Sequence, residues 1–322
     1  MADHSSMYRL VFPAPSVDPS DGVGPVLIHA LEGFADAGHG VKLTADHLRE
    51  SLHAELVASF DTDALIDYRS RRPMMSFDDD KISDVDMPRL HLHVVRDNSG
   101  RPFLLLSGSE PDLRWEEFIE AVKELADRFS VSTVIGLNSI PMAIPHTRPA
   151  TLTAHGDEDL IVGLPKWGSS LKFPASASML LEFRLSQAGY PAMGLSVHVP
   201  HYLSQTDYPA AALKAVESLQ KSARLDLPVA ALENAAESMR KQIDAEVDGN
   251  AEIESVVRAL ESQYDSFAAG QADERSLLAA DEPLPSGDEL GAEFEKYLAQ
   301  HHAGDAHHAG EPDTPDDLAD DE

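Results

Sequence analysis

The fold of this 322-residue chain is decided by residues 26–40, which read VLIHALEGFADAGHG. The apolar run that ends at Leu31 is too short for a buried helix, so it predicts an interior strand of a parallel sheet. Asp36 is suited to be the N-cap of a helix. Apolar residues then return at helical spacing, at Val41, Ala45, Leu48 and Leu52. The stretch predicts a strand, a turn and a helix, with free backbone N–H groups at the carboxyl edge of a sheet.

The chain is strongly acidic and contains no cysteine. It has 25 Lys and Arg against 56 Asp and Glu, a formal charge of -31. This excess repels phosphate groups, so neither nucleic acid nor an anionic membrane is expected as a partner. The absence of cysteine excludes a disulfide scaffold and cysteine nucleophiles. There is no apolar run of about 18 residues and no signal-peptide pattern at the start, so we expect a cytoplasmic protein.

Further apolar runs and helical stripes alternate along the chain to about residue 225. Strands are predicted over 54–60, 90–95, 102–107, 131–137 and 193–199. Helices are predicted over 115–129, 175–188 and 207–224. The run 102–107 is uniformly apolar and is expected to be central, whereas residues 151–164 are expected to add a short edge hairpin. This alternation predicts an α/β sandwich with a parallel or mixed sheet.

From residue 229 the pattern is helical only. Two apolar stripes flank Gly249 and Asn250, which predicts an antiparallel helical hairpin, and residues 288–301 suggest a further short helix. The last twenty residues contain eight acidic and no basic side chains, so they are expected to be disordered. We therefore expect an α/β domain over 1–228, an α-helical appendage over 229–302 and an acidic tail over 303–322.

Polar residues follow the ends of several predicted strands, where α/β sheets bind ligands. The ligand-binding candidates are Glu32, Gly33, Asp36, Glu110, Asp112, His146, Arg148, His201 and Tyr202. Arg148 lies on a proline-stiffened loop and is the preferred anion ligand, whereas Glu32 is a potential general base if it is buried. The competing interpretation is that these side chains satisfy loop backbone groups and that Asp36 only caps a helix.

No known catalytic or metal-binding pattern is present. The turn at Gly33 has neither a P-loop nor a Rossmann fingerprint, and no serine triad can be assembled. The aspartates of residues 78–86 lack the spacing of an EF-hand, so they are expected to form a solvated acidic loop. His198 and His201 are three apart at a strand end and would point to opposite faces. We expect no cofactor and no metal, and the catalytic residues, if any, are not identified by the sequence.

Four segments resemble the proteasome assembly chaperone family, in the prokaryotic branch related to the second assembly chaperone and with actinobacterial members. They are residues 30–38 (ALEGFADAG), 107–115 (SGSEPDLRW), 145–149 (PHTRP) and 197–202 (VHVPHY). The resemblance implies a three-layer α/β/α sandwich similar to nucleoside phosphorylases and nucleosidases, and self-association, with a trimer favoured. Eukaryotic relatives use hydrophobic-Tyr-X tails to engage the proteasome, whereas this chain ends in Ala319-Asp320-Asp321-Glu322. Docking through the tail is therefore not expected.

The resemblance and the lack of a catalytic pattern favour a non-catalytic scaffold of the assembly-chaperone type, which acts through a protein client of unknown identity. The alternative is an enzyme that binds or hydrolyses a nucleoside or nucleotide in a pocket at the carboxyl edge of the sheet. A shared fold does not by itself transfer catalysis, so the scaffold is preferred.

Overall fold

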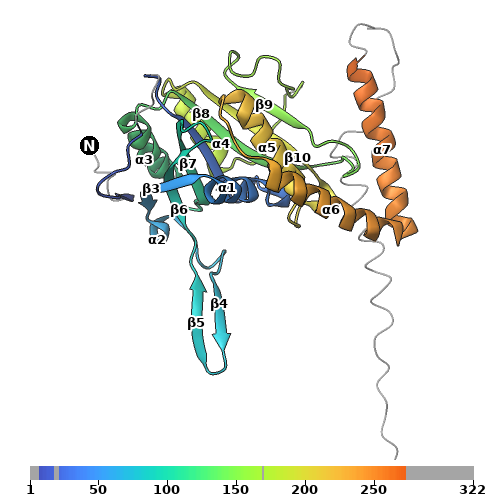
Figure 1. Ribbon diagram of the computed structural model, residues 1–322, viewed down its shortest axis with the longest axis horizontal. Helices are drawn as coiled ribbons and strands as arrows, with labels where there is room; N and C mark the ends of the chain where they lie inside the picture. Colours follow the sequence, from blue (N-terminus) through green and yellow to red (C-terminus); the bar gives the residue numbers. More distant parts are fainter. Residues whose placement is uncertain (1–6, 18–21, 169, 273–322) are drawn as a thin grey trace, which may run out of the picture. The chain divides into compact units, whose positions relative to one another are not determined.

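The computed structural model describes residues 7–17, 22–168 and 170–272, and its centre is an eight-stranded sheet (Figure 1). In order across the sheet, the strands are β1 (Tyr8–Leu10), β3 (His53–Phe60), β6 (Leu90–Arg96), β7 (Pro102–Ser109), β2 (Val26–Glu32), β8 (Thr133–Met142), β10 (Ala192–Pro200) and β9 (Leu152–Gly156). The four strands from β7 to β10 are parallel, and the flanking strands pair antiparallel. The carboxyl ends of β7, β2, β8 and β10 therefore meet at one edge, as the sequence predicts.

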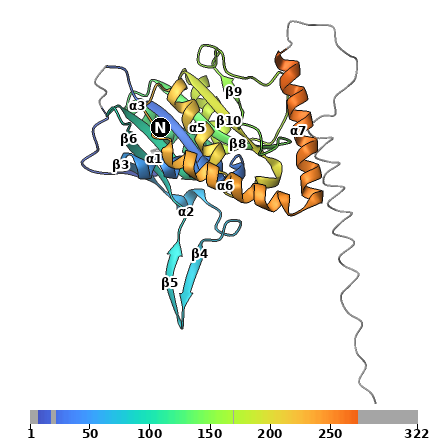
Figure 2. The ribbon, with the colours of Figure 1, turned by 45° about the vertical axis from the view of Figure 1, so that its right-hand side comes forward.

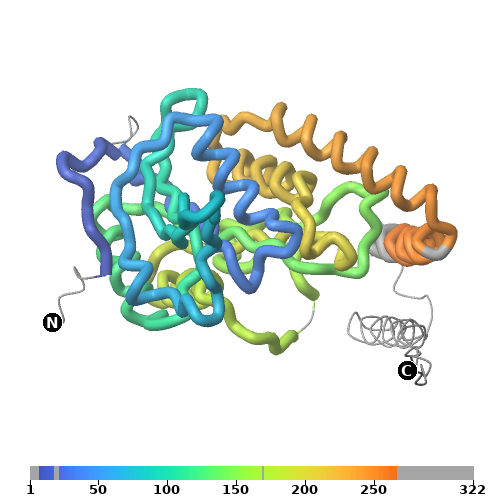
Figure 3. Tube along the Cα trace, turned by 90° about the horizontal axis from the view of Figure 1, so that it is seen from below, coloured from blue at the N-terminus to red at the C-terminus, as the bar shows by residue number. Residues whose placement is uncertain are grey.

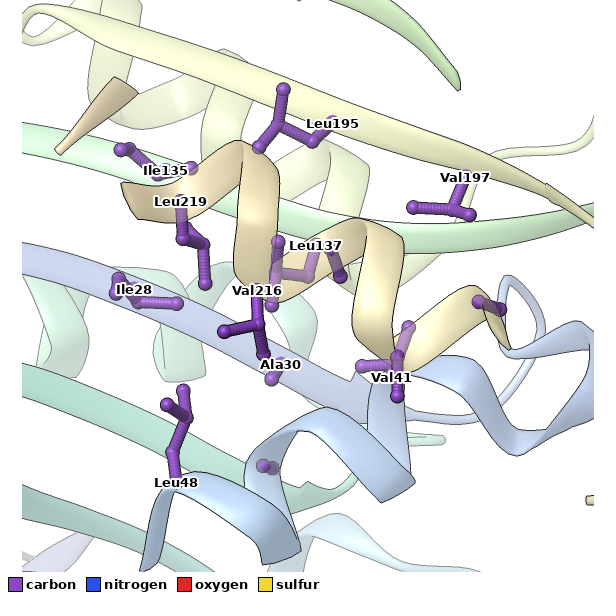
Figure 4. Close-up of a cluster of buried hydrophobic side chains, with 14 of the residues drawn as sticks. Ile28, Ala30, Val41, Leu48, Ile135, Leu137, Leu195, Val197, Val216 and Leu219 are labelled. Atoms are coloured by element: carbon purple, nitrogen blue, oxygen red, sulfur yellow. The ribbon is translucent and has the colours of Figure 1, made fainter. Parts of the chain in front are cut away.

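The sheet is covered on both faces, which gives the three-layer α/β/α sandwich. Helices α1 (Gly40–Ser51) and α5 (Pro209–Ser222) cover one face, and α3 (Trp115–Arg128) and α4 (Ala177–Gln187) cover the other. Figure 4 shows the first layer, where Val41, Leu48, Val216 and Leu219 of the helices meet Ile28, Ala30, Ile135, Leu137, Leu195 and Val197 of the strands. Because β2 and β7 are buried on both faces, most of their residues are apolar, with the buried His29 as the exception within β2, and β7 is central as expected.

A two-stranded arm projects from the body (Figures 1 and 2). It consists of β4 (Met74–Asp78) and β5 (Lys81–Asp86), which pair with each other and not with the main sheet. The stretch is solvent-exposed, as the sequence predicts, but it is not an irregular loop. The difference arises because β-prone residues alternate with the aspartates, and because Asp79 adopts a left-handed conformation (φ 52°) that suits a two-residue hairpin turn.

Two smaller features also differ from expectation. Residues 151–164 provide one edge strand, β9, and turns follow it in place of a second strand. Short helices connect the main elements: α2 (Thr62–Leu65), η2 (Ala37–His39) and η3 (His201–Leu203). No described helix is both long enough and apolar enough to cross a membrane.

Two helices follow the body, α6 (Ala230–Asp248) and α7 (Ala251–Ala272). Leu232 and Ile243 of α6 are buried in the same core as α5. Both helices are predicted correctly, but their packing differs: α7 stands at a steep angle to α6, and in Figure 3 it is seen nearly end-on. The apolar stripe of α6 faces the body, so it does not cover α7. The predicted helix at 288–301 and the acidic tail lie outside the described residues.

Candidate functional site

A cavity of about 400 Å³ opens at the carboxyl end of β2. It is lined by Glu32, Gly33, Phe34, Asp36, Ala37, His39, Lys42, Pro141, Ser204 and Gln205. The turn after β2, the first turn of α1, the end of β8 and the segment after η3 all contribute to it. Three of the predicted residues, Glu32, Gly33 and Asp36, are therefore in one cavity at the predicted edge.

Asp36 holds the start of helix α1. Its Oδ1 accepts the N–H of Val41 at 2.7 Å and lies 3.4 Å from the hydroxyl of Ser139. Burial raises the pKa of Asp36 to about 6, although hydrogen bonds from the backbone N–H groups of Val41 and Lys42 oppose this rise. The N-cap residue of α1 is His39, because the 3-10 turn η2 separates Asp36 from the helix, so the prediction of Asp36 as N-cap is wrong in position; its carboxylate nevertheless accepts an N–H of the first turn of α1. The side chain also lines the cavity, so the two interpretations of Asp36 do not exclude each other.

Glu32 ends β2 and also lines the cavity. Burial raises the pKa of its carboxyl group, and the nearby Lys42 works against this rise. Within the part of the chain that the structure describes, no hydrogen bond to the Glu32 carboxylate is found. The bases of the cavity are already paired, because Lys42 contacts Asp46 at 2.7 Å and His39 contacts Asp207 at 2.7 Å.

Glu110 lies beside this cavity and holds its wall, whereas Asp112 fixes the loop that follows α2. The buried carboxylate of Glu110 accepts the N–H of Phe34 at 2.7 Å and the N–H of Ala177, the first residue of α4, at 2.6 Å. Gly33 packs so closely on Glu110 that a Cβ atom there would clash with its side chain. Asp112 accepts the N–H of Asp67 at 2.8 Å and pairs with Arg71 at 2.7 Å. Both carboxylates satisfy loop backbone groups, as the competing interpretation proposes.

His146 and Tyr202 form a second cluster, which holds helix α6. The Tyr202 hydroxyl accepts the N–H of His146 at 2.8 Å and lies 2.7 Å from its Nδ1. The other ring nitrogen of His146 lies 3.2 Å from Asp244 of α6. His201 packs its ring edge-to-face against Tyr202, with the centroids 5.4 Å apart.

Arg148 holds helix α7 in the same way. Its guanidinium binds both carboxylate oxygens of Asp265, at 2.8 and 2.7 Å, and contacts Glu261 at 3.1 Å. Thr147 donates to the same Glu261 at 2.5 Å. The guanidinium of Arg148 is therefore engaged by carboxylates of the chain itself.

The chain matches the model of the PAC2 family over residues 30–247. It belongs to the PAC2 family. The fold of this PAC2 chain is similar to that of a Mycobacterium tuberculosis protein of unknown function, with a TM-score of 0.80 and 53% identity over 82% of this chain and 92% of the other. A Corynebacterium glutamicum protein of unknown function gives a TM-score of 0.78 and 46% identity over 81% and 97% of the two chains. The family resemblance found in the four sequence segments is thus confirmed.

A more distantly similar structure is that of a protein described by a function. A proteasome-assembly chaperone homologue of Mycobacterium tuberculosis has a TM-score of 0.65 and 25% identity over 72% of this chain and 99% of its own. A comparison with curated proteins finds no match.

Four polar residues that line the cavity of this PAC2 protein are not among the candidates from the sequence: His39, Lys42, Ser204 and Gln205. The first two follow Asp36 within two helical turns, so their nearness is visible in the sequence. Ser204 and Gln205 follow β10, which is two strands away from β2 in the sheet. Only the strand order brings that segment to the cavity.

The cavity predicts a pH dependence of stability. The pKa of Asp36 is about 6 in the folded protein against 3.8 in the unfolded chain, so the folded state keeps a proton that the unfolded chain has released between these values. The stabilisation is full below about pH 4 and is lost as the pH rises through about 6. In Asp36→Asn the amide oxygen can still accept the N–H of Val41, and the loss of stability with rising pH is expected to disappear. In the control Asp159→Asn, which changes an exposed side chain, the loss of stability should remain. Denaturant melts from pH 4 to 7 measure both; the same loss in Asp36→Asn would contradict the assignment.

Proposed function

We propose that this PAC2 protein is a non-catalytic, assembly-chaperone-like scaffold that works in the cytoplasm as a homo-oligomer. The family membership and the similarity to a proteasome-assembly chaperone homologue support the chaperone-like role. A trimer is favoured by the likeness of the fold to nucleoside phosphorylases. The observation that carries the self-association is the apolar surface of the arm.

The arm exposes large apolar side chains that the described part of the chain does not cover. Met74 is 75% exposed, Phe77 67% and Ile82 61%, and Met75 and Val85 are exposed as well. A two-stranded hairpin alone is only marginally stable in water, so it needs a second surface to pack on. Exposed apolar groups on this scale mark interaction sites.

A second copy of the chain offers a surface of matching chemistry. Exposed apolar side chains are frequent along residues 162–183, from the segment after β9 into α4: Val162, Trp167, Leu171, Phe173 and Phe183. Lys166 and Lys172 accompany them, while the tip of the arm carries Asp78, Asp79 and Asp80. Apolar area and opposite charge therefore favour packing of the arm of one copy on this segment of the next.

Removing the apolar side chains of the arm is expected to break the oligomer. Phe77→Ser combined with Ile82→Ser removes two of its most exposed apolar groups, and light scattering should then give the 34.9 kDa mass of one chain. The matched control is Ser76→Ala with Ser83→Ala, which changes two exposed polar side chains of the same arm that the proposed contact does not use, and it should leave the oligomer intact. A wild-type chain that is already monomeric would refute the self-association, and an unchanged mass in the apolar variant would exclude the arm.

A second candidate function is ligand binding in the cavity. It is favoured by the half-buried Glu32, because burial raises the pKa of its carboxyl group and no described residue donates a hydrogen bond to that carboxylate. An enzyme that binds or hydrolyses a nucleoside or nucleotide, the alternative to the scaffold, would use the same cavity. Incubation with nucleosides, with and without phosphate, tests it: turnover that is lost in Glu32→Gln or Arg148→Ala would overturn the non-catalytic scaffold.

A further inference from the structure

We propose that the cavity at the carboxyl end of β2 binds a protonated amine or guanidinium group, which Glu32 and Asp36 recognise. This inference rests on the second candidate function, ligand binding in the cavity, and adds the chemical class of the ligand. It is independent of the self-association through the arm.

The balance of charge around the cavity is the first argument. Glu32 faces Lys42, Asp46, Arg49 and His39, and Asp36 faces Glu32 and His39. Lys42 and Arg49 both pair with Asp46, and His39 pairs with Asp207. Lys42 therefore divides its charge between Asp46 and Glu32. The four carboxylates Glu32, Asp36, Asp46 and Asp207 outnumber the three bases Lys42, Arg49 and His39, so the described surroundings of the cavity carry an excess of negative charge. A ligand that supplies a positive charge would correct this imbalance.

The shape and the apolar rim are the second argument. A volume of about 400 Å³ falls within the range of small-ligand sites. Phe34 is 65% exposed at the cavity, and Pro141 lies on another wall. An aliphatic stem could pack on these two rings while its cation reaches the carboxylates, and the face of Phe34 itself attracts a cation. Ser204 and Gln205 add hydrogen-bond acceptors.

The lining of the cavity disfavours a phosphate group as ligand. The start of a helix next to a cavity would ordinarily favour an anion, because its N–H groups are free. Here the carboxylate of Asp36 already accepts the N–H of Val41 at 2.7 Å. Glu32 and Asp36 would repel a phosphate, and the two bases of the lining, Lys42 and His39, are already paired with Asp46 and Asp207. The site therefore selects against nucleotides and in favour of cations.

Calorimetric titration of the full chain with n-butylamine, and with n-butanol as its uncharged analogue, tests the proposal. The amine is expected to bind and the alcohol not to bind. Glu32→Gln is expected to weaken amine binding by roughly ten- to a hundred-fold, the loss that follows from removing a charge-assisted hydrogen bond. The matched control is Glu124→Gln, which changes an exposed carboxylate of α3 on the opposite face of the sheet. Binding should also strengthen from pH 5 to 7, as Asp36 ionises while the amine stays protonated.

Two further ligands distinguish the sources of the cation. A capped Gly-Lys-Gly peptide represents a lysine side chain of a protein partner, and putrescine represents a free amine. Tighter binding of either one supports the proposal and identifies the source, and acetylation of the peptide lysine should abolish its binding. Equal binding of butanol and butylamine, or unchanged binding in Glu32→Gln, would overturn the proposal. If the protein bound nucleosides but no amine, the cationic ligand class would be wrong and ligand binding in the cavity would stand. If it bound neither nucleosides nor amines, ligand binding in the cavity would be wrong as well.

Discussion

A chain that ends at Leu227 is expected to melt roughly 10 °C below the full-length protein. The truncation removes Leu232 and Ile243 from the core that α6 shares with α5. Burial of one large apolar side chain is worth about 1.5–3 kcal/mol, and each kcal/mol corresponds to about 2–4 °C in a domain of this size class. The contacts of His146 and Arg148 with the two helices are lost at the same time. Differential scanning calorimetry of both chains gives the comparison.

The matched comparison is a chain that ends at His302, which keeps α6 and α7 and removes only the acidic tail of residues 303–322. It should melt close to the full-length protein if that tail is dispensable, as its composition predicts. Light scattering on the same chains reports on assembly. An equally stable and unchanged oligomer after truncation at Leu227 would show that the two helices contribute neither to the body nor to its self-association.

Glu110→Ala is expected to be the most destabilising single substitution near the cavity. Its carboxylate accepts the N–H groups of Phe34 and Ala177, and both donors would lose their partner. A hydrogen bond to a charged group is worth about 1.5–3 kcal/mol, so the loss of two should cost about 3–6 kcal/mol in the free energy of unfolding. Urea denaturation measures this cost.

Two further variants separate the hydrogen bonds from the general loss of a side chain. Glu110→Gln keeps the size but can accept only one of the two bonds, so it should recover part of the stability at most. Glu124→Ala removes an exposed carboxylate and should change stability by less than about 0.5 kcal/mol. If Glu110→Ala resembled Glu124→Ala, the bracing role of Glu110 would be wrong.

The sequence predicts the body well because local periodicity determines it. The strand at Val26–Glu32, the turn and helix α1 follow from residues that are close in the chain, and the uniformly apolar run at 102–107 is central. The packing of α7 could not be predicted in the same way. An apolar stripe shows that a face is buried, but not what covers it, and the contacts that hold α7 join Arg148 to Asp265, 117 residues later.

The sequence indicates at which strand ends the candidate residues lie, but it does not show which of them contact one another. Strand topology brings all the predicted residues to one edge, yet they divide between a cavity, its braces and the loop that holds the C-terminal helices. Glu110 illustrates the reason. Its role depends on the N–H of Ala177, 67 residues later, and on the close packing of Gly33. Neither contact leaves a local pattern in the sequence.

The negative charges of the arm disfavour edge-to-edge pairing between the arms of two copies of the chain. Both strands of a free hairpin offer unpaired backbone groups, and identical arms could pair edge to edge into open-ended fibres. Asp78, Asp79 and Asp80 at the tip and Asp84 and Asp86 on β5 give each arm a concentrated negative charge, so two arms repel each other. In the proposed homo-oligomer, an arm that does not pair with another arm would pack on a different surface of the next copy, and such head-to-tail contacts stop growing once they close into a ring.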